Sequence, residues 1–304
     1  MSQNTTKAHL ALLGANLIYG ANYLIAKGVM PNKIGASAFV LIRVIGAGLL
    51  FWIVKQFVKE KVDKKDFILL MLCGLLGVST NMLLFFHGLS LTSPIDASII
   101  MTSTPVIVLI LSAFILKEKI TTNKYIGIII GAIGAFLLIW FGKKSGGTSS
   151  FLGNLFVFLN ACSYATYLVV VKPLMKKYKA ITVISWVFLF GLIFVFPFGI
   201  NDLLTTNFSA FTTNTYLAIT FVIIGTTFFA YLLNIYALNY VSPSVNGSYI
   251  YLQPVLSFIM VSIYAFVLGH KEYAQDINLV KIASCFLVII GVYMISKKPK
   301  QLLN

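Results

Sequence analysis

Charged side chains are scarce in this sequence. Only 10% of its 304 residues are Asp, Glu, Lys or Arg, and only eight residues are acidic. Soluble domains carry about 25% charged and about 45–50% apolar residues, whereas this chain is 59% apolar with a mean hydropathy of +0.93. The composition therefore excludes an ordinary soluble domain and predicts an integral membrane protein.

Side chains that carry out chemistry are also few. The chain has three His and three Cys, and each Cys lies inside an apolar run without the CxxC or His spacing of a metal or redox site. The sequence contains no P-loop, no GxSxG and no HExxH motif, and most of its acidic residues lie in loops. We therefore expect a protein that is not an enzyme and that carries no metal or cofactor.

The net charge of +15 comes from lysines that lie mostly in short segments between apolar runs. Lysines placed in this way orient the spans of a membrane protein. The pattern favours that explanation over a nucleic-acid partner. The expected partners are the lipid bilayer and a small-molecule substrate.

Ten apolar stretches are long enough to cross a bilayer as helices, which takes roughly 17–25 residues. They are Ala8–Ala26, Ile34–Val54, Phe67–Leu91, Ile95–Leu116, Tyr125–Phe141, Phe151–Val171, Ile181–Ile200, Thr215–Asn239, Ser244–Leu268 and Asn278–Ser296. The Gly- and Ser-rich segment Lys143–Ser150 divides them into two groups of five. The predicted fold is all-α, with one five-helix unit in residues 1–145 and a second in residues 146–304.

The distribution of positive charge predicts the orientation. If the N-terminus is inside, the inner segments hold 16 lysines and the outer segments hold 6. Inner loops of membrane proteins are the ones enriched in Lys and Arg. We therefore expect a multi-pass protein of the cell (inner) membrane with both termini in the cytoplasm. The first apolar run lacks a small-residue cleavage site, so we expect it to be retained as a span.

One stretch occurs twice. Thr92–Lys119 resembles Val241–Glu272, so that Pro94 and Pro105 in the first copy correspond to Pro243 and Pro254 in the second. The starts of the halves also match, because Asn16, Ala21, Tyr23 and Leu24 recur 144 residues later as Asn160, Ala165, Tyr167 and Leu168. Five helices per half is an odd number, so the second half enters the membrane from the opposite side. An inverted-topology repeat follows, with expected helix kinks at Pro105 and Pro254.

Polar residues form matching stripes on the first helix of each half. Asn16 and Tyr23 lie seven residues apart on one face, and Asn160, Tyr164 and Tyr167 form the related stripe. These amides and phenols can line a cavity for a polar solute. They can instead hold helices together, with the tyrosines in an aromatic belt. The mid-span position of both asparagines favours the cavity.

Three further residues in spans are candidates for contact with a solute. Arg43 lies roughly 13 Å from the outer end of its helix, at 1.5 Å per residue, and can bind an anionic group or hold helices together through carbonyls. His87 either forms a proton-sensing pair with Asp96 or lines the cavity alone, while Asp96 can instead cap the next helix. Gln253 directly precedes Pro254 and is too long to serve only the kink. Ser98 and Thr102 fit a structural role beside Pro105.

Small residues in the fifth predicted span favour close packing between helices. Gly127 and Gly131 have the small-xxx-small spacing of membrane helix contacts. The pair also permits a homodimer through this helix.

Two stretches resemble a known family. Ile18–Gly28, IYGANYLIAKG, and Phe39–Arg43, FVLIR, are similar to the first two helices of the drug/metabolite transporter superfamily, EamA type. The paired Pro-in-helix segments also resemble that family. The resemblance implies ten helices in two repeats around a central cavity, in a carrier that often exports amino acids or other metabolites. Many members carry Trp where this chain has Tyr19, and Ala-Leu where it has His87 and Gly88.

We therefore expect a secondary active transporter, an exporter of a small metabolite such as an amino acid or amphipathic zwitterion, that works by alternating access. The expected substrate contacts are Asn16, Tyr23, Arg43, His87, Tyr164, Tyr167 and Gln253. Proton coupling through His87 stays open. The alternatives are a membrane-embedded enzyme or lipid-handling protein, and a passive uniporter or channel.

Overall fold

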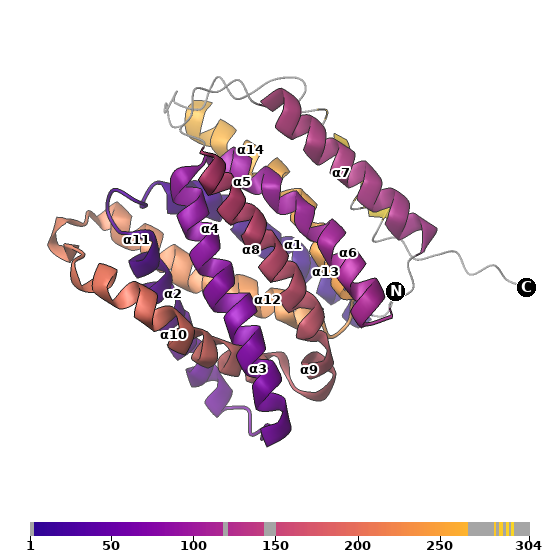
Figure 1. Ribbon diagram of the computed structural model, residues 1–304, viewed down its shortest axis with the longest axis horizontal. Coiled ribbons are helices and arrows are strands. Elements are labelled where there is room, and N and C mark those ends of the chain that lie inside the picture. Colours follow the sequence, from indigo (N-terminus) through magenta and orange to yellow (C-terminus); the bar gives the residue numbers. More distant parts are fainter. Residues whose placement is uncertain are drawn as a thin grey trace, which may run out of the picture.

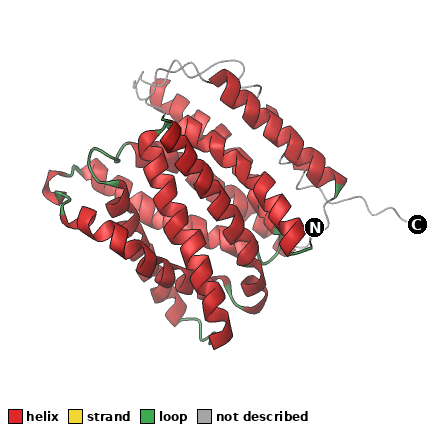
Figure 2. Cartoon of the chain, in the orientation of Figure 1, coloured by secondary structure: helices red, strands yellow, loops and turns green. Residues whose placement is uncertain are grey.

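The computed structural model describes residues 3–117, 121–142 and 150–266, together with seven residues between 283 and 294. Every regular element in these described parts is helical (Figure 2). Most elements are α-helices, and short 3₁₀ or π segments join several of them end to end.

The elements from the first part of the chain are α1 (Gln3–Lys27), α2 (Ala36–Gln56), η1 (Lys64–Asp66), α3 (Phe67–Gly74), η2 (Leu75–Ser79), α4 (Thr80–Leu91), α5 (Pro94–Ile100), η3 (Met101–Ser103), α6 (Thr104–Ile115) and α7 (Thr122–Gly142). The elements from the later part are α8 (Phe151–Val170), α9 (Lys172–Lys177), α10 (Ala180–Leu204), η4 (Phe208–Ala210), α11 (Thr213–Phe221), η5 (Val222–Phe229), α12 (Ala230–Ala237), α13 (Pro243–Ser248), η6 (Tyr249–Tyr251) and α14 (Leu252–Phe266). Figure 1 shows their arrangement.

Eight helical stretches in the described part have the length and hydropathy of a membrane span. They are Asn4–Lys27, Ala36–Lys55, Lys64–Leu91, Pro94–Ile115, Phe151–Lys177, Ala180–Leu204, Thr213–Ala237 and Pro243–Ala265. Each coincides with one of the ten predicted stretches, so a multi-pass helical membrane protein is confirmed. The fifth predicted stretch coincides with α7, which is not one of the eight, and the tenth lies mostly outside the described residues. A total of ten spans stays a prediction.

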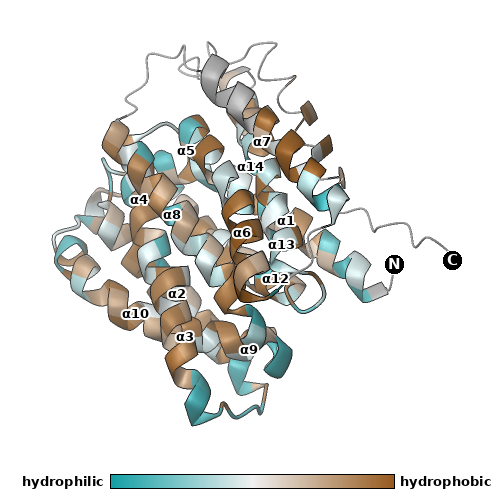
Figure 3. Cartoon of the chain, turned by 45° about the vertical axis from the view of Figure 1, so that its right-hand side comes forward, coloured by the Kyte–Doolittle hydropathy of each residue, from teal (hydrophilic) through white to brown (hydrophobic). Residues whose placement is uncertain are grey.

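The helices form one bundle in which segments from distant parts of the chain pack side by side. α2 lies along α10, α4 along α8, and α1 against α12 and α14, while α7 lies at the edge of the bundle (Figure 1). Large apolar side chains cover the outside, and Phe114, Phe151 and Phe198 are 81%, 84% and 65% exposed. Figure 3 shows apolar helix surfaces between hydrophilic segments at the ends, the pattern that a bilayer requires.

Two spans change to a 3₁₀ turn shortly before a proline. The turn η3 ends at Ser103, two residues before Pro105, and η6 ends at Tyr251, three residues before Pro254. Proline has no N–H for the carbonyl four residues earlier, and its ring crowds that carbonyl, so the preceding turn must change its bonding. Thr102 and Ser103 donate their hydroxyls to the carbonyls of Ile99 and Ile100 at 2.6 and 2.8 Å, the structural role expected of Thr102.

Two other spans contain a π segment that no sequence signal indicated. The segment η2 joins α3 to α4, and η5 joins α11 to α12. A π segment inserts residues into the α-helical register and rotates the side chains that follow it. Both segments therefore change which residues of their spans face the centre of the bundle.

The glycine pair of α7 makes its close contact within the chain. A Cβ atom on Gly291 would lie 2.7 Å from the Gly127 carbonyl oxygen and 2.7 Å from the Gly131 nitrogen. A Cβ atom on Gly131 would in turn lie 2.8 Å from the ring of Tyr251. The pair thus allows backbones to approach inside one molecule, and a homodimer remains a prediction.

Candidate functional site

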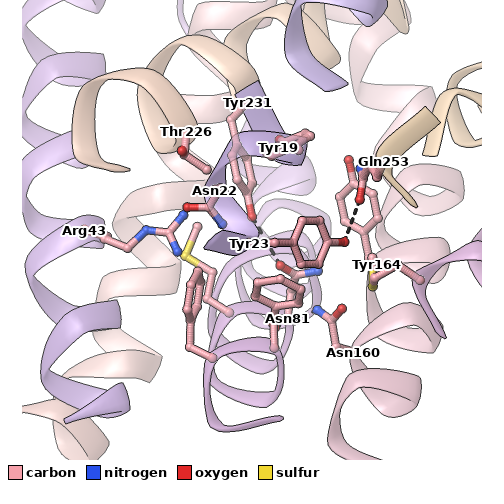
Figure 4. Close-up of a pocket in the computed structure, with 14 residues that line it drawn as sticks. Tyr19, Asn22, Tyr23, Arg43, Asn81, Asn160, Tyr164, Thr226, Tyr231 and Gln253 are labelled. Atoms are coloured by element: carbon pink, nitrogen blue, oxygen red, sulfur yellow. Dashed lines mark hydrogen bonds between the residues drawn. The ribbon is translucent and has the colours of Figure 1, made fainter. Parts of the chain in front are cut away.

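A cavity lies among the central helices. It is lined by Tyr19, Asn22, Tyr23, Arg43, Asn81, Met82, Phe85, Phe86, Met101, Asn160, Tyr164, Thr226, Tyr231 and Gln253 (Figure 4). Its volume, measured as the space open to the centre of a water molecule, is about 60 Å³. That is room for roughly four to six waters, since each occupies about 10–15 Å³ by this measure. The cavity can hold a small polar solute.

Arg43 carries the formal charge of the cavity wall. The residue is 2% exposed, and its Nε donates a hydrogen bond of 3.0 Å to Thr227 Oγ1. Its guanidinium carbon lies 4.2 Å from the ring centre of Phe86 and 5.7 Å from that of Phe39, within the range of cation–π attraction. None of the lining residues that the structure describes is Asp or Glu. The cavity wall is therefore positive.

Four lining residues carry a buried polar atom that has no hydrogen-bond partner. These atoms are Asn22 Oδ1, Arg43 Nη1, Asn160 Oδ1 and Thr226 Oγ1. All four residues are at most 3% exposed. A buried polar group without a partner costs about 1–3 kcal/mol. The wall therefore offers both donors and acceptors to a molecule that enters the cavity.

A chain of hydrogen bonds joins α1 to α14 at one side of the cavity. Tyr23 donates its hydroxyl to Gln253 Oε1 at 2.7 Å (Figure 4), and Gln253 Nε2 donates to Asn16 Oδ1 at 2.9 Å. Asn16 Nδ2 in turn donates to the carbonyl of Leu12 at 2.8 Å. Asn16 is not among the lining residues, so it orients Gln253 from behind the wall.

A second group of bonds joins α4, α8 and α12 around the cavity. Asn160 Nδ2 donates to the backbone carbonyl of Asn81 at 2.7 Å, and Tyr231 donates its hydroxyl to Asn81 Oδ1 at 3.2 Å (Figure 4). Tyr164, on α8, lines the cavity as well. Three helices that are far apart in the sequence thus meet at the cavity.

The structure brings four of the seven predicted contacts to the cavity wall: Tyr23, Arg43, Tyr164 and Gln253. Asn16 lies behind them. Tyr167 is 1% exposed and lies against Gly77, where a Cβ would be 2.4 Å from its ring. Tyr167 lies one turn further along α8 than Tyr164. At that position its ring packs between α8 and η2 and does not line the cavity.

His87 is not among the lining residues of the cavity. Its Nε2 is hydrogen-bonded to Ser37 Oγ at 2.8 Å, near the start of α2. The cap of the next helix is Ser93, whose hydroxyl accepts from the backbone N–H of Asp96 at 3.0 Å. Ser93 is therefore the N-cap residue, and Asp96 places its negative charge in the first turn, where it suits the helix dipole.

Several lining residues were not selected from the sequence. Asn22 lies about 100° around the helix from Tyr23, since an α-helix has 3.6 residues per turn, and the stripe pattern passed over it. Thr226 lies inside the π segment η5, and Tyr231 lies two residues after the end of that segment. The π segment shifts the register, so an α-helical pattern misplaces both residues. Asn81, which the sequence indicated only as a weaker candidate for a solute contact, likewise lies two residues after the end of η2.

The fold and the cavity define a multi-pass helical membrane protein with a buried polar site between its spans. The chain belongs to the EamA-like transporter family, which matches residues 6–140 and again residues 151–297. This result confirms the family resemblance found in the first two helices.

Individual relatives agree with this family. "Uncharacterized transporter YetK" of Bacillus subtilis (strain 168) is 26% identical over 301 residues, which is 97% of this chain and 88% of the relative. An "Uncharacterized transporter" of Archaeoglobus fulgidus is 28% identical over 239 residues, which is 79% of this chain and 81% of the relative. These names describe transporters and no enzymes, which fits the expectation from the sequence.

A crystal structure of another protein shares the fold. It superimposes with a TM-score of 0.72 over 95% of this chain and 96% of the other chain, at 17% identity. At that identity the likeness shows the arrangement of the helices and nothing about a substrate.

Proposed function

We propose that this protein is a secondary active transporter that exports a small metabolite, such as an amino acid or another amphipathic zwitterion. The observation that carries the proposal is the central cavity, whose wall holds four buried polar atoms without partners. Buried polar groups in membrane spans are costly and mark solute pathways. Tyr, Phe and Met side chains in the same wall suit the apolar part of such a molecule.

The proposed mechanism is alternating access by two inverted repeats of five helices, residues 1–145 and 146–304. In such carriers the two repeats rock around a site in the middle of the membrane. The cavity takes side chains from both proposed repeats, including Tyr23 and Arg43 from the first and Tyr164 and Gln253 from the second. A site built in this way changes when the repeats move relative to each other.

Matching helix breaks support the repeat. In each proposed repeat a π segment interrupts one span, η2 and η5, and a 3₁₀ turn before a proline interrupts the next, η3 and η6. The serine before each leading proline caps the following helix, since Ser93 accepts from Asp96 N and Ser242 accepts from Val245 N. The family matches each half separately as well.

A pair of lysines adds further support. Lys27, at the end of α1, donates its Nζ to the carbonyls of Leu89 and Ser90 at 2.9 and 3.0 Å. Lys172, just after α8, donates its Nζ to the carbonyls of Leu238 and Val241. Each lysine therefore satisfies the free carbonyls at the end of the third span in its own half. Such a matched pair is expected of two halves with one ancestral fold.

The proposed location is the cell (inner) membrane, with both termini in the cytoplasm. Its support is the excess of lysines, 16 against 6, in the segments that this orientation places inside. The alternative functions are a passive uniporter or channel, and a membrane-embedded enzyme or lipid-handling protein. An enzyme would need a nucleophile or an acid/base pair in the cavity, and the lining residues in the described ranges include no His, Cys, Asp or Glu.

Counterflow in proteoliposomes tests the proposal. Vesicles that contain the purified protein are preloaded with one unlabelled compound and exposed to a trace of its labelled form. The panel covers amino acids, polyamines, nucleobases and sugar phosphates. We expect saturable counterflow with one class, reduced in Gln253→Ala, because that change removes a cavity side chain and its two bonds to α1.

The outcomes separate the candidate functions. A carrier saturates and shows counterflow, whereas a pore passes solute without either property. If folded protein gives no counterflow with any class, the carrier proposal is wrong, and assays of lipid or enzyme activity become the next step.

A further inference from the structure

The guanidinium of Arg43 lacks the partners that a buried cation requires. Nε has Thr227 as its partner, but Nη1 is buried without any hydrogen bond. The Phe86 ring lies over the guanidinium, with its centre 4.2 Å from the guanidinium carbon, and leaves Nη1 without a hydrogen-bond partner. A charge in a span is stable only when it is paired, hydrogen-bonded or hydrated. The N–H edge of Arg43 is therefore a binding position for a ligand.

The described residues supply no anion to this edge. The described acidic side chains lie elsewhere: Asp66 pairs with Lys177 at 3.1 Å, Glu60 accepts from Lys179 N, and Asp202 accepts from Ala38 N. Asp63 and Asp96 are also outside the cavity lining. Within the described part of the chain, no acidic side chain lies in the cavity lining beside Arg43, and a molecule that enters the cavity can supply this charge.

Two polar side chains lie on the same side of the cavity as Arg43. In the view of Figure 4, Asn22 and Thr226 lie toward the Arg43 side of the cavity, and Gln253, Tyr164 and Asn160 lie toward the other side. Thr226 Oγ1 and Asn22 Oδ1 have no partners either. A carboxylate seated here accepts charge-assisted bonds from Arg43 and a further bond from the Thr226 hydroxyl, which satisfies two of the four open positions.

We propose that Arg43 and Thr226 form a carboxylate-binding subsite, and that the substrate is a small molecule with a single carboxylate. The inference deepens the proposed transport function and rests on it. One guanidinium balances one negative charge, so a phosphate monoester with two charges fits the subsite poorly. An amine without a carboxylate has no acidic partner among the described lining residues, and it has no anionic group that Arg43 can bind.

Compounds that differ only at the carboxylate test this subsite. L-Leucine, 4-methylpentanoate, leucinamide and 3-methylbutylamine share one apolar group, but only the first two carry a carboxylate. L-Phenylalanine and phenylalaninamide form a second pair. Two measurements use the purified full chain: counterflow in proteoliposomes, and the rise in unfolding temperature that each compound causes in detergent.

We expect the carboxylates to exchange and to raise the unfolding temperature, while the amides and the amine do neither. Arg43→Gln should abolish the difference between acid and amide.

Thr226→Val keeps the shape of the side chain, and it should raise KM for the carboxylates by about 3- to 10-fold, the effect of one hydrogen bond. Arg43→Lys keeps the charge and should retain the preference for acids with a KM raised by about 10- to 100-fold, because the bidentate fork is lost. Lys59→Gln is the charge control, since Lys59 is exposed and distant from the cavity lining.

The two proposals can fail separately. If leucinamide exchanges as well as leucine, or if folded Arg43→Gln keeps the wild-type KM for acids, the carboxylate subsite is wrong while transport stands. If the acids raise the unfolding temperature through Arg43 without any counterflow, the subsite stands and the transport function falls. If no carboxylate in the panel either binds or exchanges, the subsite is overturned. Should Arg43→Gln not fold, the Arg43→Lys and Thr226→Val variants decide between these outcomes.

Discussion

The hydroxyl of Tyr23 donates a 2.7 Å hydrogen bond to Gln253 Oε1, across 230 residues of sequence. Both residues are buried, and both line the central cavity. The bond ties α1 in the first proposed repeat to α14 in the second. Gln253 also donates to Asn16, so one amide holds two residues of α1. Any rocking of the halves must strain or break this link.

Removing either partner should destabilise the protein. Tyr23→Phe leaves Gln253 Oε1 unpaired, and we expect the free energy of unfolding to fall by about 0.5–1.5 kcal/mol, since buried polar pairs in membranes are worth less than the largest values in water. Gln253→Leu should cost at least as much because it also frees Asn16 Oδ1. The measurement is unfolding in mixed detergent micelles.

A double-mutant cycle isolates this bond. The variant with both Tyr23→Phe and Gln253→Leu should lose less stability than the sum of the two single variants, because each single change already breaks the same contact. Strictly additive losses would show that the two side chains do not interact in the folded protein.

The two capping lysines should matter equally for stability. Lys27→Met and Lys172→Met keep most of the side-chain length. They remove the lysine donors from the carbonyls of Leu89 and Ser90 in α4, and from those of Leu238 and Val241 just after α12. Each change should lower the free energy of unfolding by about 1–3 kcal/mol, the cost of buried acceptors without partners. Lys33→Met is the matched control, because Lys33 is exposed. An effect no larger than that of the control would rule out the capping role.

The pH dependence of transport tests proton coupling through His87. His87, on α4, is hydrogen-bonded to Ser37 on α2. The other histidine that the structure describes is His9, on α1. If His87 exchanges the coupled proton, His87→Gln should flatten the dependence of flux on pH between about 5 and 8, the range in which His titrates. His9→Gln is the control, since His9 is hydrogen-bonded to Tyr249 at 2.7 Å. A profile identical to wild type in His87→Gln would exclude this residue as the coupling group.

An ion pair near the predicted cytoplasmic end links the two halves. Lys177 Nζ lies 3.1 Å from Asp66 Oδ2, and the Tyr178 hydroxyl donates to the same oxygen at 2.7 Å. We expect Asp66→Asn to weaken this link and to favour the inward-open form. Because the pair is partly exposed, stability should change by only about 0–1 kcal/mol.

Accessibility reports this shift. A cysteine at the cavity position Met101, in a chain without its three native cysteines, should react about 2- to 5-fold faster with a cytoplasmic maleimide when Asp66→Asn is added, in proportion to the population gained. Lys176→Gln, at an exposed lysine beside Lys177, is the control. Equal rates with and without Asp66→Asn would mean that this pair does not hold the cytoplasmic end closed.

The amino-acid sequence by itself determined the membrane class, the family and the course of the spans. Hydropathy is a property of neighbouring residues, so α3 to α4, for example, begins at Phe67 and ends at Leu91 in both prediction and structure. Prolines act locally as well, and Pro105 and Pro254 each follow a 3₁₀ turn. Local patterns were not sufficient to place Asn16, Tyr167 and His87, which were expected to contact substrate and are not in the cavity lining.

Only the tertiary structure decided which polar side chains share a cavity. The partner of Arg43 is Thr227, 184 residues away, and helical periodicity carries no information on which helices become neighbours. The π segments η2 and η5 then rotate Asn81 and Tyr231 relative to an unbroken α-helix. Packing between helices, together with these changes of register, places the open donors and acceptors around one small space, because that arrangement depends on contacts between distant parts of the chain.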